Sequence, residues 1–393
     1  MPNDDQPLAG LRVLEFTHMV MGPSAGLILA DLGADVIRVE PPGGDQTRNL
    51  KGAGAGYFAM YNRNKRSVCL NLKAEKGIEL ARRLARSVDI VIENFRPGTL
   101  ERLGLGYEAL SPDNPRLIYC AAKGFLSGPY KDRAALDEVA QMMGGLAYMT
   151  GPPGRPLRAG ASIIDVTGGM FGVIGILALL DRRRRSGHGG RVDCSLFETT
   201  AFLVGQHIAQ LAVTGQAAPP MPARISAWAV YDVFDTADGQ QLFLGVVSDS
   251  QWQSFCSAFG LADFAADPAL QTNNLRIAHR EQIIPRIRSL CAAQPRDALL
   301  ARFEAAGLPA AKIARPEDLL DDEHLAASHG LLDLTLPDGK SARLPALPLE
   351  LDGRRCELRR NPRRAGEDSQ TVLEEIGVSE EEFAELVRGG VLV

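Results

Sequence analysis

The chain lacks the residue patterns of proteins that depend on metal ions or disulfide bonds. Its six cysteines are scattered along 393 residues, and no two of them have a two-residue spacing, so neither a zinc knuckle nor a dithiol redox motif is present. The six histidines are equally dispersed and have no carboxylate cluster beside them. The sequence therefore predicts no metal site.

An excess of charge of either sign is also missing. The 43 basic and 48 acidic side chains give a net charge of −5, so the chain offers no bulk attraction to nucleic acid or to anionic lipid. Its first ten residues, MPNDDQPLAG, do not have the basic and then apolar pattern of a secretory signal. We expect a cytoplasmic protein, and a hydrophobic content of 45% is typical of a globular chain with a large core.

One segment imitates a membrane span. Residues 159–180 form a long apolar run that ends at Asp181 and four arginines, as at a cytoplasmic membrane boundary. However, Asp165 interrupts this run, four glycines reduce its bulk, and no second such segment exists. We therefore expect a buried helix of a globular domain, with the arginines at its C-terminal end, where the helix dipole favours cations.

The first third of the chain alternates short apolar runs with amphipathic segments. Strands are predicted over 11–16, 35–39, 67–72, 89–92 and 117–121, and helices over 23–32 and 74–87. This alternation is typical of a parallel sheet flanked by helices, so we expect an α/β, Rossmann-like fold. The first turn, residues 17–23, lacks the G-x-G-x-x-G pattern of dinucleotide sites, and GAGAG at 52–56 follows no strand and indicates a loop.

The pattern changes after a Gln-, Ala- and Pro-rich stretch at 216–222. Strands are predicted over 230–234, 241–247 and 311–313, and helices over 251–259, 280–290 and 295–306. These segments indicate a smaller α+β domain over 223–330. We expect it to be inserted in a large Rossmann-like domain made of residues 1–222 and 331–393.

A single carboxylate, Asp165, has two possible roles. It stands in the apolar run ASIIDVTGG, where burying a carboxylate is costly unless a partner compensates it. In one interpretation Asp165, or Thr167, caps the helix that follows. In the other it is a nucleophile that attacks an activated acyl group to form an anhydride, while the N–H groups of the helix N-terminus stabilise the oxyanion. These residues alone leave both roles open.

Five blocks in a fixed order carry a resemblance to a known family. They contain LEFTHMVMGP at 14–23, NKRSV at 64–68, ENFRPG at 93–98, LDEVAQ at 136–141 and GASIID at 160–165. Over essentially its whole length the chain resembles the class III CoA-transferases, a family that includes formyl-CoA transferase, carnitine CoA-transferase and α-methylacyl-CoA racemase. The resemblance places the nucleophile on Asp165. It also matches Asp137 to a second carboxylate, which either orients the acceptor or is only a helix N-terminal charge.

The resemblance also implies a CoA site. The positions that match the family's CoA contacts are Leu70, Lys73, Asn94, Phe95, Arg96 and Arg102. This set is chemically reasonable, because arginine and lysine neutralise phosphates and an aromatic ring covers the adenine or the pantetheine. CoA would be a substrate here, and the thioester already supplies the activation, so no metal or prosthetic group is implied.

The activity implied by the resemblance is transfer of CoA from an acyl-CoA donor to a small carboxylic acid, by an interlocked homodimer. The acid acceptor is expected to be a dicarboxylate such as succinate or glutarate, with Arg48 or Arg224 pairing its distal carboxylate. Neither nucleic acid nor a membrane is expected as a partner.

Two departures from the family pattern narrow this reading. Formyl-CoA transferase carries a run of glycines where this chain has GVVSDSQ at 245–251, which makes formyl or oxalyl chemistry less expected. The racemase branch has a histidine just before the block that matches 134–141, and this chain has none there. A transferase is therefore favoured, with an α-methylacyl-CoA racemase or a non-catalytic CoA-binding module as alternatives.

Overall fold

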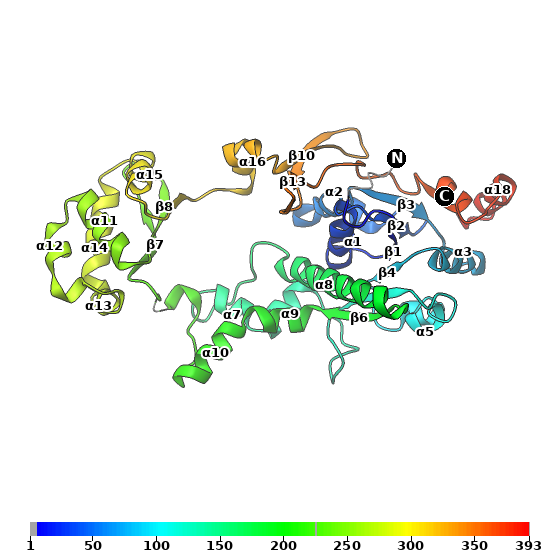
Figure 1. The fold of residues 1–393 in the computed structure, drawn as a ribbon, viewed down its shortest axis with the longest axis horizontal. Coiled ribbons are helices and arrows are strands. Elements are labelled where there is room, and N and C mark those ends of the chain that lie inside the picture. Colours follow the sequence, from blue (N-terminus) through cyan, green and yellow to red (C-terminus); the bar gives the residue numbers. More distant parts are fainter. Residues whose placement is uncertain (1–5, 225, 393) are drawn as a thin grey trace. The chain divides into compact units, whose positions relative to one another are not determined.

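The chain forms two compact units (Figure 1). The computed structural model describes residues 6–224 and 226–392, so half of the acidic start MPNDDQPLAG lies outside it. One unit is built from both ends of the chain, Met1–Ala223 and Glu323–Val393, and the other from Arg224–Asp322. The small domain was expected over 223–330, whereas the second unit spans Arg224–Asp322 and the residues from Glu323 onward belong to the first unit.

Six parallel strands form the main sheet of the first unit, in the order β3-β2-β1-β4-β5-β6. They are β1 (Arg12–Phe16), β2 (Asp35–Glu40), β3 (Lys65–Cys69), β4 (Ile90–Glu93), β5 (Ile118–Lys123) and β6 (Gly190–Ser195). The expected parallel α/β sheet is thus confirmed. The chain winds outward from β1 in one direction and from β4 in the other, so the switch point lies between these two strands. Ligands bind beyond the carboxyl ends of the strands at such a point.

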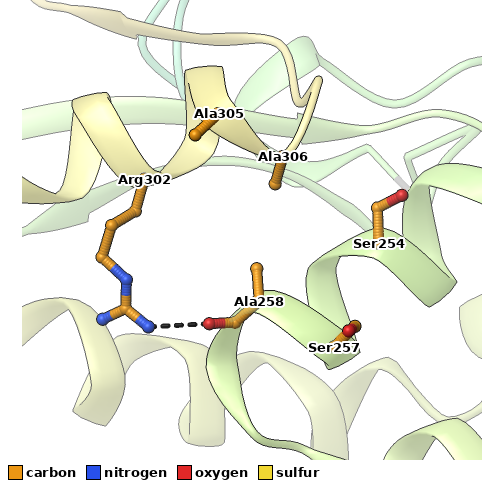
Figure 2. Close-up of a pocket in the computed structure, with 6 residues that line it drawn as sticks. All are labelled: Ser254, Ser257, Ala258, Arg302, Ala305 and Ala306. Atoms are coloured by element: carbon orange, nitrogen blue, oxygen red, sulfur yellow. Dashed lines mark hydrogen bonds between the residues drawn. The ribbon is translucent and has the colours of Figure 1, made fainter.

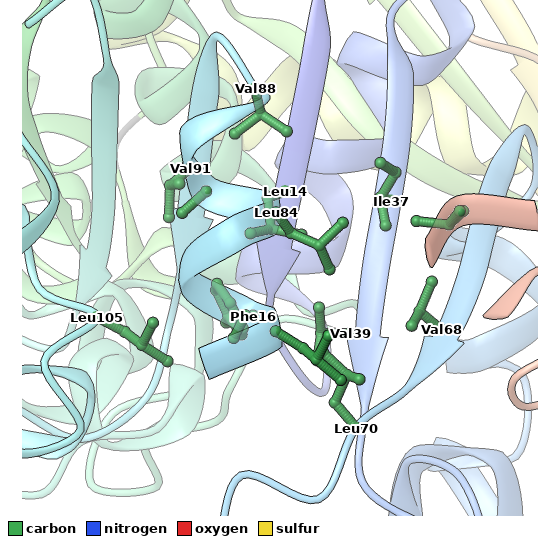
Figure 3. Close-up of a cluster of buried hydrophobic side chains, with 14 of the residues drawn as sticks. Leu14, Phe16, Ile37, Val39, Val68, Leu70, Leu84, Val88, Val91 and Leu105 are labelled. Carbon is green, nitrogen blue, oxygen red and sulfur yellow. The ribbon is translucent and has the colours of Figure 1, made fainter. Parts of the chain in front are cut away.

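The sheet is covered on both faces, because successive residues of each strand point to opposite sides. Val13 of β1 packs with α1 (Met21–Asp31) and α8 (Ile163–Ser186), whereas the next residue, Leu14, packs with α3 (Glu75–Arg86). Figure 3 shows Leu14, Phe16, Ile37 and Val39 in the α3 core. The central strands are therefore nearly continuous apolar runs, as is typical of a sheet buried on both faces.

The glycines of α8 allow it to pack directly on its neighbours. A Cβ atom on Gly169 would lie 2.3 Å from Oγ of Ser24 in α1, and one on Gly175 would lie 2.3 Å from Val192 in β6. One face of the helix is therefore buried in the core, whereas the sequence led us to expect a buried helix. Among the described residues α8 is the one helix long and apolar enough to cross a membrane by length and composition. Its other face exposes Met170, Phe171, Ile174 and Leu177.

Shorter elements complete the first unit. They are η1 (Gln46–Asn49), η2 (Gly52–Gly54), α2 (Tyr57–Tyr61), α4 (Thr99–Arg102), α5 (Tyr107–Leu110), α6 (Asp137–Met143), α7 (Leu146–Thr150), α9 (Leu196–Leu203), α10 (Gly205–Thr214) and η3 (Met221–Ala223). The expected loop at GAGAG contains the η2 turn. In this unit the turns and short helices lie mainly at the strand ends, where they supply most of the candidate site.

The C-terminal segment packs against the edge strand β3. It contains α16 (Glu323–Ala327), the hairpin β10 (Leu331–Thr335) and β11 (Ser341–Pro345), the pair β12 (Glu350–Leu351) and β13 (Arg354–Arg355), α17 (Ser369–Glu374) and α18 (Glu380–Arg388). Asp368 accepts a hydrogen bond from the Ser67 N–H at 2.9 Å, and Ser369 accepts one from the Cys69 N–H at 3.1 Å. The segment thus covers an edge that would otherwise expose unpaired backbone groups.

The second unit is a three-stranded antiparallel sheet with helices. Its elements are β7 (Val230–Asp235), β8 (Gln241–Val246), α11 (Asp249–Phe259), α12 (Ala262–Ala266), η4 (Pro268–Leu270), α13 (Asn273–Ala278), α14 (Arg280–Ala292), α15 (Arg296–Ala305), β9 (Ala310–Lys312) and η5 (Pro316–Asp321). A cavity of about 470 Å³ opens between α11 and α15 (Figure 2). Arg302 lines this cavity, but its guanidinium donates to the Ala258 carbonyl and to Gln294, and no predicted site residue lies there.

Candidate active site

Asp137 caps the helix that carries Asp165. Asp165 is the third residue of α8, and Asp137 is the first residue of α6. Oδ2 of Asp137 accepts hydrogen bonds from the backbone N–H groups of Ile164 at 2.9 Å and of Asp165 at 3.1 Å. The interpretation of Asp165 or Thr167 as the cap is therefore wrong, because the capping carboxylate comes from another helix, and Oγ1 of Thr167 donates to the Ile163 carbonyl.

The remaining N–H groups of the first turn are also occupied. Ile163 N–H donates to the Ala161 carbonyl, and Val166 N–H donates to the Ser162 carbonyl. The N–H groups at the start of a helix lack intrahelical partners, and those of Ile163, Ile164 and Asp165 have acceptors here, whereas the Val166 N–H makes the first intrahelical bond. The expected oxyanion role is therefore contradicted for these three N–H groups, since each is already engaged.

The surroundings of Asp165 disfavour its charged form. Burial is the largest cause and the negative charge of Asp137 is the second, and together they raise the pKa of Asp165 to about 7, while Arg158 opposes the rise. No hydrogen bond to the Asp165 carboxylate comes from the residues that the structure describes. Strongly perturbed carboxylates of this kind concentrate at functional sites.

Asp137 is itself held by two side chains. Its Oδ1 atom accepts a hydrogen bond from Gln141 Nε2 at 2.5 Å and lies 3.5 Å from Arg158 Nη2. The Oε1 atom of the buried Gln141 accepts from the Ala159 N–H at 2.8 Å. These contacts tie the loop before α8 to α6. Asp137 is thus both a helix N-terminal charge and the residue that orients the start of α8.

Two tyrosines of α2 lie at the same helix terminus. The Tyr57 hydroxyl is 3.3 Å from Oγ of Ser162. Burial raises the pKa of Tyr61, and the nearby charge of Asp165 raises it further. Neither tyrosine was predicted from the sequence. Their spacing of four residues, which places both on one face of a helix, was the available signal.

Asn94, Phe95 and His18 meet at the switch point between β1 and β4. Asn94 accepts a hydrogen bond from the His18 N–H and donates one to the His18 carbonyl, both at 2.9 Å. The His18 ring stacks on Phe95 with a centroid separation of 5.3 Å. Burial lowers the pKa of His18, so the imidazole is neutral near pH 7. The structure thus brings the predicted Asn94 and Phe95 together, and it adds His18, which the sequence did not single out.

Helix α1 connects this cluster to Asp165. A Cβ atom on Gly22, near the start of α1, would lie 3.0 Å from Cγ of Asn94, and one on Gly168 would lie 2.7 Å from Cε of Met21. Gly168 is one helical turn beyond Asp165. The start of α1 therefore contacts both the Asn94 cluster and the first turns of α8.

A buried ion pair holds the backbone of Phe95. Oε2 of Glu93 accepts from the Phe95 N–H at 3.0 Å, and Nζ of Lys123 donates to the Phe95 carbonyl at 2.9 Å. Lys123 also forms an ion pair with Oε1 of Glu93. Burial raises the pKa of Glu93, and Lys123 opposes that rise. The backbone N–H and carbonyl of one residue, Phe95, are thus both fixed by side chains from adjacent strands.

The other predicted CoA-binding residues differ in how exposed their side chains are. Lys73 and Arg96 are exposed on the loops after β3 and β4, and their side chains form no hydrogen bond or ion pair with the residues that the structure describes. Arg102 Nη2 lies 3.4 Å from Thr99 Oγ1. Their free cationic groups suit phosphates. Leu70 is different, because its side chain is buried in the α3 core (Figure 3). A side-chain contact of Leu70 with CoA is therefore not supported by its position.

Comparison with known proteins identifies the family. The model described as CoA-transferase family III matches residues 8–369. The chain belongs to this family. The transferase is 34% identical over 389 residues to a succinate–glutarate CoA-transferase of Agrobacterium fabrum, covering 96% of this chain and 97% of that protein. It is 35% identical over 341 residues to a succinyl-CoA–D-citramalate CoA-transferase of Chloroflexus aurantiacus, covering 85% of each chain.

A solved structure agrees with this assignment. A CaiB/BaiF family protein from Brucella suis matches the transferase with a TM-score of 0.83 and 32% identity, covering 94% of this chain and 99% of that one. The resemblance drawn from the five sequence blocks is therefore confirmed. The chain is an enzyme of the class III acyl-CoA:carboxylate CoA-transferase family.

Proposed function

We propose that the transferase moves CoA from an acyl-CoA donor to a carboxylic acid through covalent intermediates on Asp165. The observation that carries this proposal is the position of Asp165, in the first turn of α8 with a raised pKa and no hydrogen bond from a described residue on its carboxylate. A carboxylate whose oxygens are not engaged by the protein is available as a nucleophile.

The proposed sequence begins when an Asp165 oxygen attacks the acyl carbon of the donor thioester. The C–S bond breaks, and CoA leaves as the thiolate with an acyl–aspartyl anhydride on the enzyme. The thiolate then attacks Cγ of Asp165 and releases the donor acid, which leaves an aspartyl-CoA thioester. The acceptor carboxylate attacks the same Cγ and expels the thiolate. Attack of the thiolate on the acyl carbon of this second anhydride gives the new acyl-CoA and restores Asp165.

The protein groups have separate parts in this sequence. Asp137 fixes the N-terminus of α8 and thereby the position of Asp165. Phe95 covers the adenine or the pantetheine of CoA, and the exposed Lys73, Arg96 and Arg102 pair with its phosphates. Because Glu93 and Lys123 hold the Phe95 backbone, the residue that carries the ring is positioned before CoA binds.

The acceptor is proposed to be a dicarboxylic acid. This choice is supported by relatives at similar identity that are named for succinate, glutarate and D-citramalate. Arg48, one of the two arginines expected to pair the distal carboxylate, is already engaged: its Nε and Nη2 bond Glu40 at 2.7 and 2.5 Å, and its Nη1 donates to the Arg363 carbonyl at 2.9 Å. Arg48 is therefore not available for that role, and the prediction for Arg224 stays a prediction.

A homodimer is also proposed. The exposed apolar side chains of α8 continue onto α9 and α10, and we call this surface, made of Met170, Phe171, Ile174, Leu177, Phe202, Ile208 and Leu211, the α8–α10 face. Phe171 and Phe202 are in ring contact at 5.4 Å, so the face is continuous between helices. Large exposed apolar surfaces of this kind mark interaction sites, and a second copy of the chain would cover this one.

The covalent intermediate tests the mechanism directly. Incubation with succinyl-CoA alone should add the mass of CoA to the peptide that contains Asp165, and hydroxylamine should convert that carboxylate to a hydroxamate. Asp165→Asn should abolish both products without unfolding the chain, because Asp137 still caps α8. An enzyme that gains only the succinyl mass and never the mass of CoA, or a label on a Cys194 or Ser195 peptide, would contradict the proposal. Exchange of CoA into a second acid distinguishes the transferase from a racemase.

A further inference from the structure

Arg158 lies beside both carboxylates of the candidate site. Its Nη2 atom is 3.5 Å from Oδ1 of Asp137, and Oδ2 of the same carboxylate accepts the Asp165 N–H at 3.1 Å. One carboxylate group therefore separates the guanidinium from the residue proposed as the nucleophile. The charge of Arg158 also opposes the rise in the pKa of Asp165, which agrees with this closeness.

The Arg158 guanidinium is fixed in place but not fully used. Nε donates to the Ala159 carbonyl and Nη2 donates to the Ala161 carbonyl, both at 3.2 Å, so two backbone groups orient the plane. Nη1 forms no hydrogen bond with a residue that the structure describes, and 35% of the side chain is exposed. An arginine presents five N–H donors in a rigid fork. Part of that fork is therefore open to a ligand at the site.

Arg48 does not have this property. All three of its guanidinium nitrogens are engaged, and the group also lies over the Phe58 ring at 3.8 Å. Freeing Arg48 for a substrate would leave the fully buried Glu40 without its partner, which is costly for a buried carboxylate. Of Arg48 and Arg158, only Arg158 can accept a second carboxylate without leaving a fully buried carboxylate unpaired.

We propose that Arg158 binds the second carboxylate of a dicarboxylic acid acceptor while the first carboxylate attacks the aspartyl-CoA thioester. This inference rests on the proposed function. An acceptor with two negative charges approaches the negative Asp137, and a cation at this place offsets the repulsion. Guanidinium and carboxylate groups form directional, charge-assisted pairs. Arg158 therefore sets a preference for dicarboxylic over monocarboxylic acids of the same length.

The experiment compares two acids in three proteins. Glutarate and pentanoate have the same carbon chain and differ in the second carboxylate, and kcat/KM is measured for each with succinyl-CoA as the donor. For a transfer through an enzyme-bound intermediate, kcat/KM of the acid reports only the steps after CoA is loaded on Asp165, so effects on the donor cancel. The proteins are the wild type, Arg158→Gln and the matched control Arg155→Gln, which removes the same charge from an exposed position in the same loop.

Arg158→Gln should lower the ratio of the glutarate to the pentanoate kcat/KM about tenfold or more, as expected for loss of a hydrogen-bonded charge pair. Arg155→Gln should leave that ratio unchanged, and Arg158→Lys, which keeps the charge but not the fork, should lower it less. Loading of CoA on Asp165, measured by intact mass, verifies that each variant is folded.

Three results would overturn the inference: an unchanged ratio in Arg158→Gln, an equal loss in Arg155→Gln, or a wild type with no preference for glutarate. If the wild type loads CoA on Asp165 and any of these three results is found, only the role of Arg158 is refuted. A wild type that loads no CoA from succinyl-CoA refutes the proposed function itself and this inference with it.

Discussion

Replacement of Asp137 by asparagine separates its charge from its role as a helix cap. The asparagine oxygen can still accept the N–H groups of Ile164 and Asp165, but the negative charge beside Asp165 is gone. Since that charge is the second cause of the raised pKa of Asp165, after burial, we expect the pKa to fall by about one pH unit, which corresponds to about 1.4 kcal/mol. Burial is unchanged, so the pKa should stay above its ordinary value.

The assay is the pH dependence of CoA loading in a single turnover. The ionised carboxylate is the nucleophile, so in the wild type the loading rate should rise with pH through about 7, the pKa of Asp165. In Asp137→Asn the same rise should occur at lower pH. A profile that coincides with that of the wild type would refute our account of how Asp137 acts on Asp165.

The free energy of unfolding provides an independent measurement of the charge of Asp137 and of its role as a helix cap. The folded state holds the Asp165 proton more tightly than the unfolded state, so its contribution to the free energy of unfolding is present at low pH and is lost as the pH rises from about 4 to about 7. Because Asp137→Asn lowers the pKa of Asp165 in the folded state, this loss of stability should be complete at a lower pH than in the wild type. Asp137→Ala removes the cap as well, and we expect it to lower the free energy of unfolding by about 1–2 kcal/mol in urea titrations.

Three further predictions follow from the packing of the first unit. Lys123→Met leaves Glu93 buried without its cation and should lower the free energy of unfolding by about 3–5 kcal/mol. Because Lys123 also holds the Phe95 carbonyl, the same change should raise the KM of acyl-CoA more than it lowers kcat. An unchanged KM would refute the proposed role of Phe95 in binding CoA. Gly169→Val places its side chain against Ser24 and should prevent a soluble, folded product, as judged by circular dichroism. Ile174→Glu places a charge on the α8–α10 face and should shift the mass measured by light scattering from dimer to monomer, whereas a wild type that is already monomeric contradicts the proposed dimer.

The parallel sheet was predictable because its central strands are apolar on both faces. Val13 and Leu14, successive residues of β1, pack into opposite cores, and the sequence records this as adjacent apolar residues. The edge strand β3 was predicted over 67–72 and is found at Lys65–Cys69. Lys65 and Arg66 are buried by ion pairs with Glu15 and Asp35, and a hydrophobic pattern cannot reveal polar residues that are buried in this way.

The contacts that build the site were less predictable because they join distant segments. The cap of α8 was sought among its neighbours in the sequence, whereas it comes from Asp137, which lies outside the helix and its flanking residues. In the same way, Phe95 is held by Lys123 from the adjacent strand. The resemblance supplied the identities of Asp137 and Phe95 but not these contacts, since motif positions do not specify which side chains meet.

The use of a separate residue as the cap has a chemical consequence for Asp165. A carboxylate that accepted the N–H groups at the start of α8 would be stabilised as an anion, because hydrogen bonds to the charged form lower a carboxyl pKa. The same hydrogen bonds would occupy the lone pairs that must attack the thioester. In this chain Asp137 accepts those N–H groups, and the helix is stabilised without engaging the Asp165 oxygens. The raised pKa of Asp165 is the cost of this arrangement, and its free oxygens are what the proposed nucleophilic role requires.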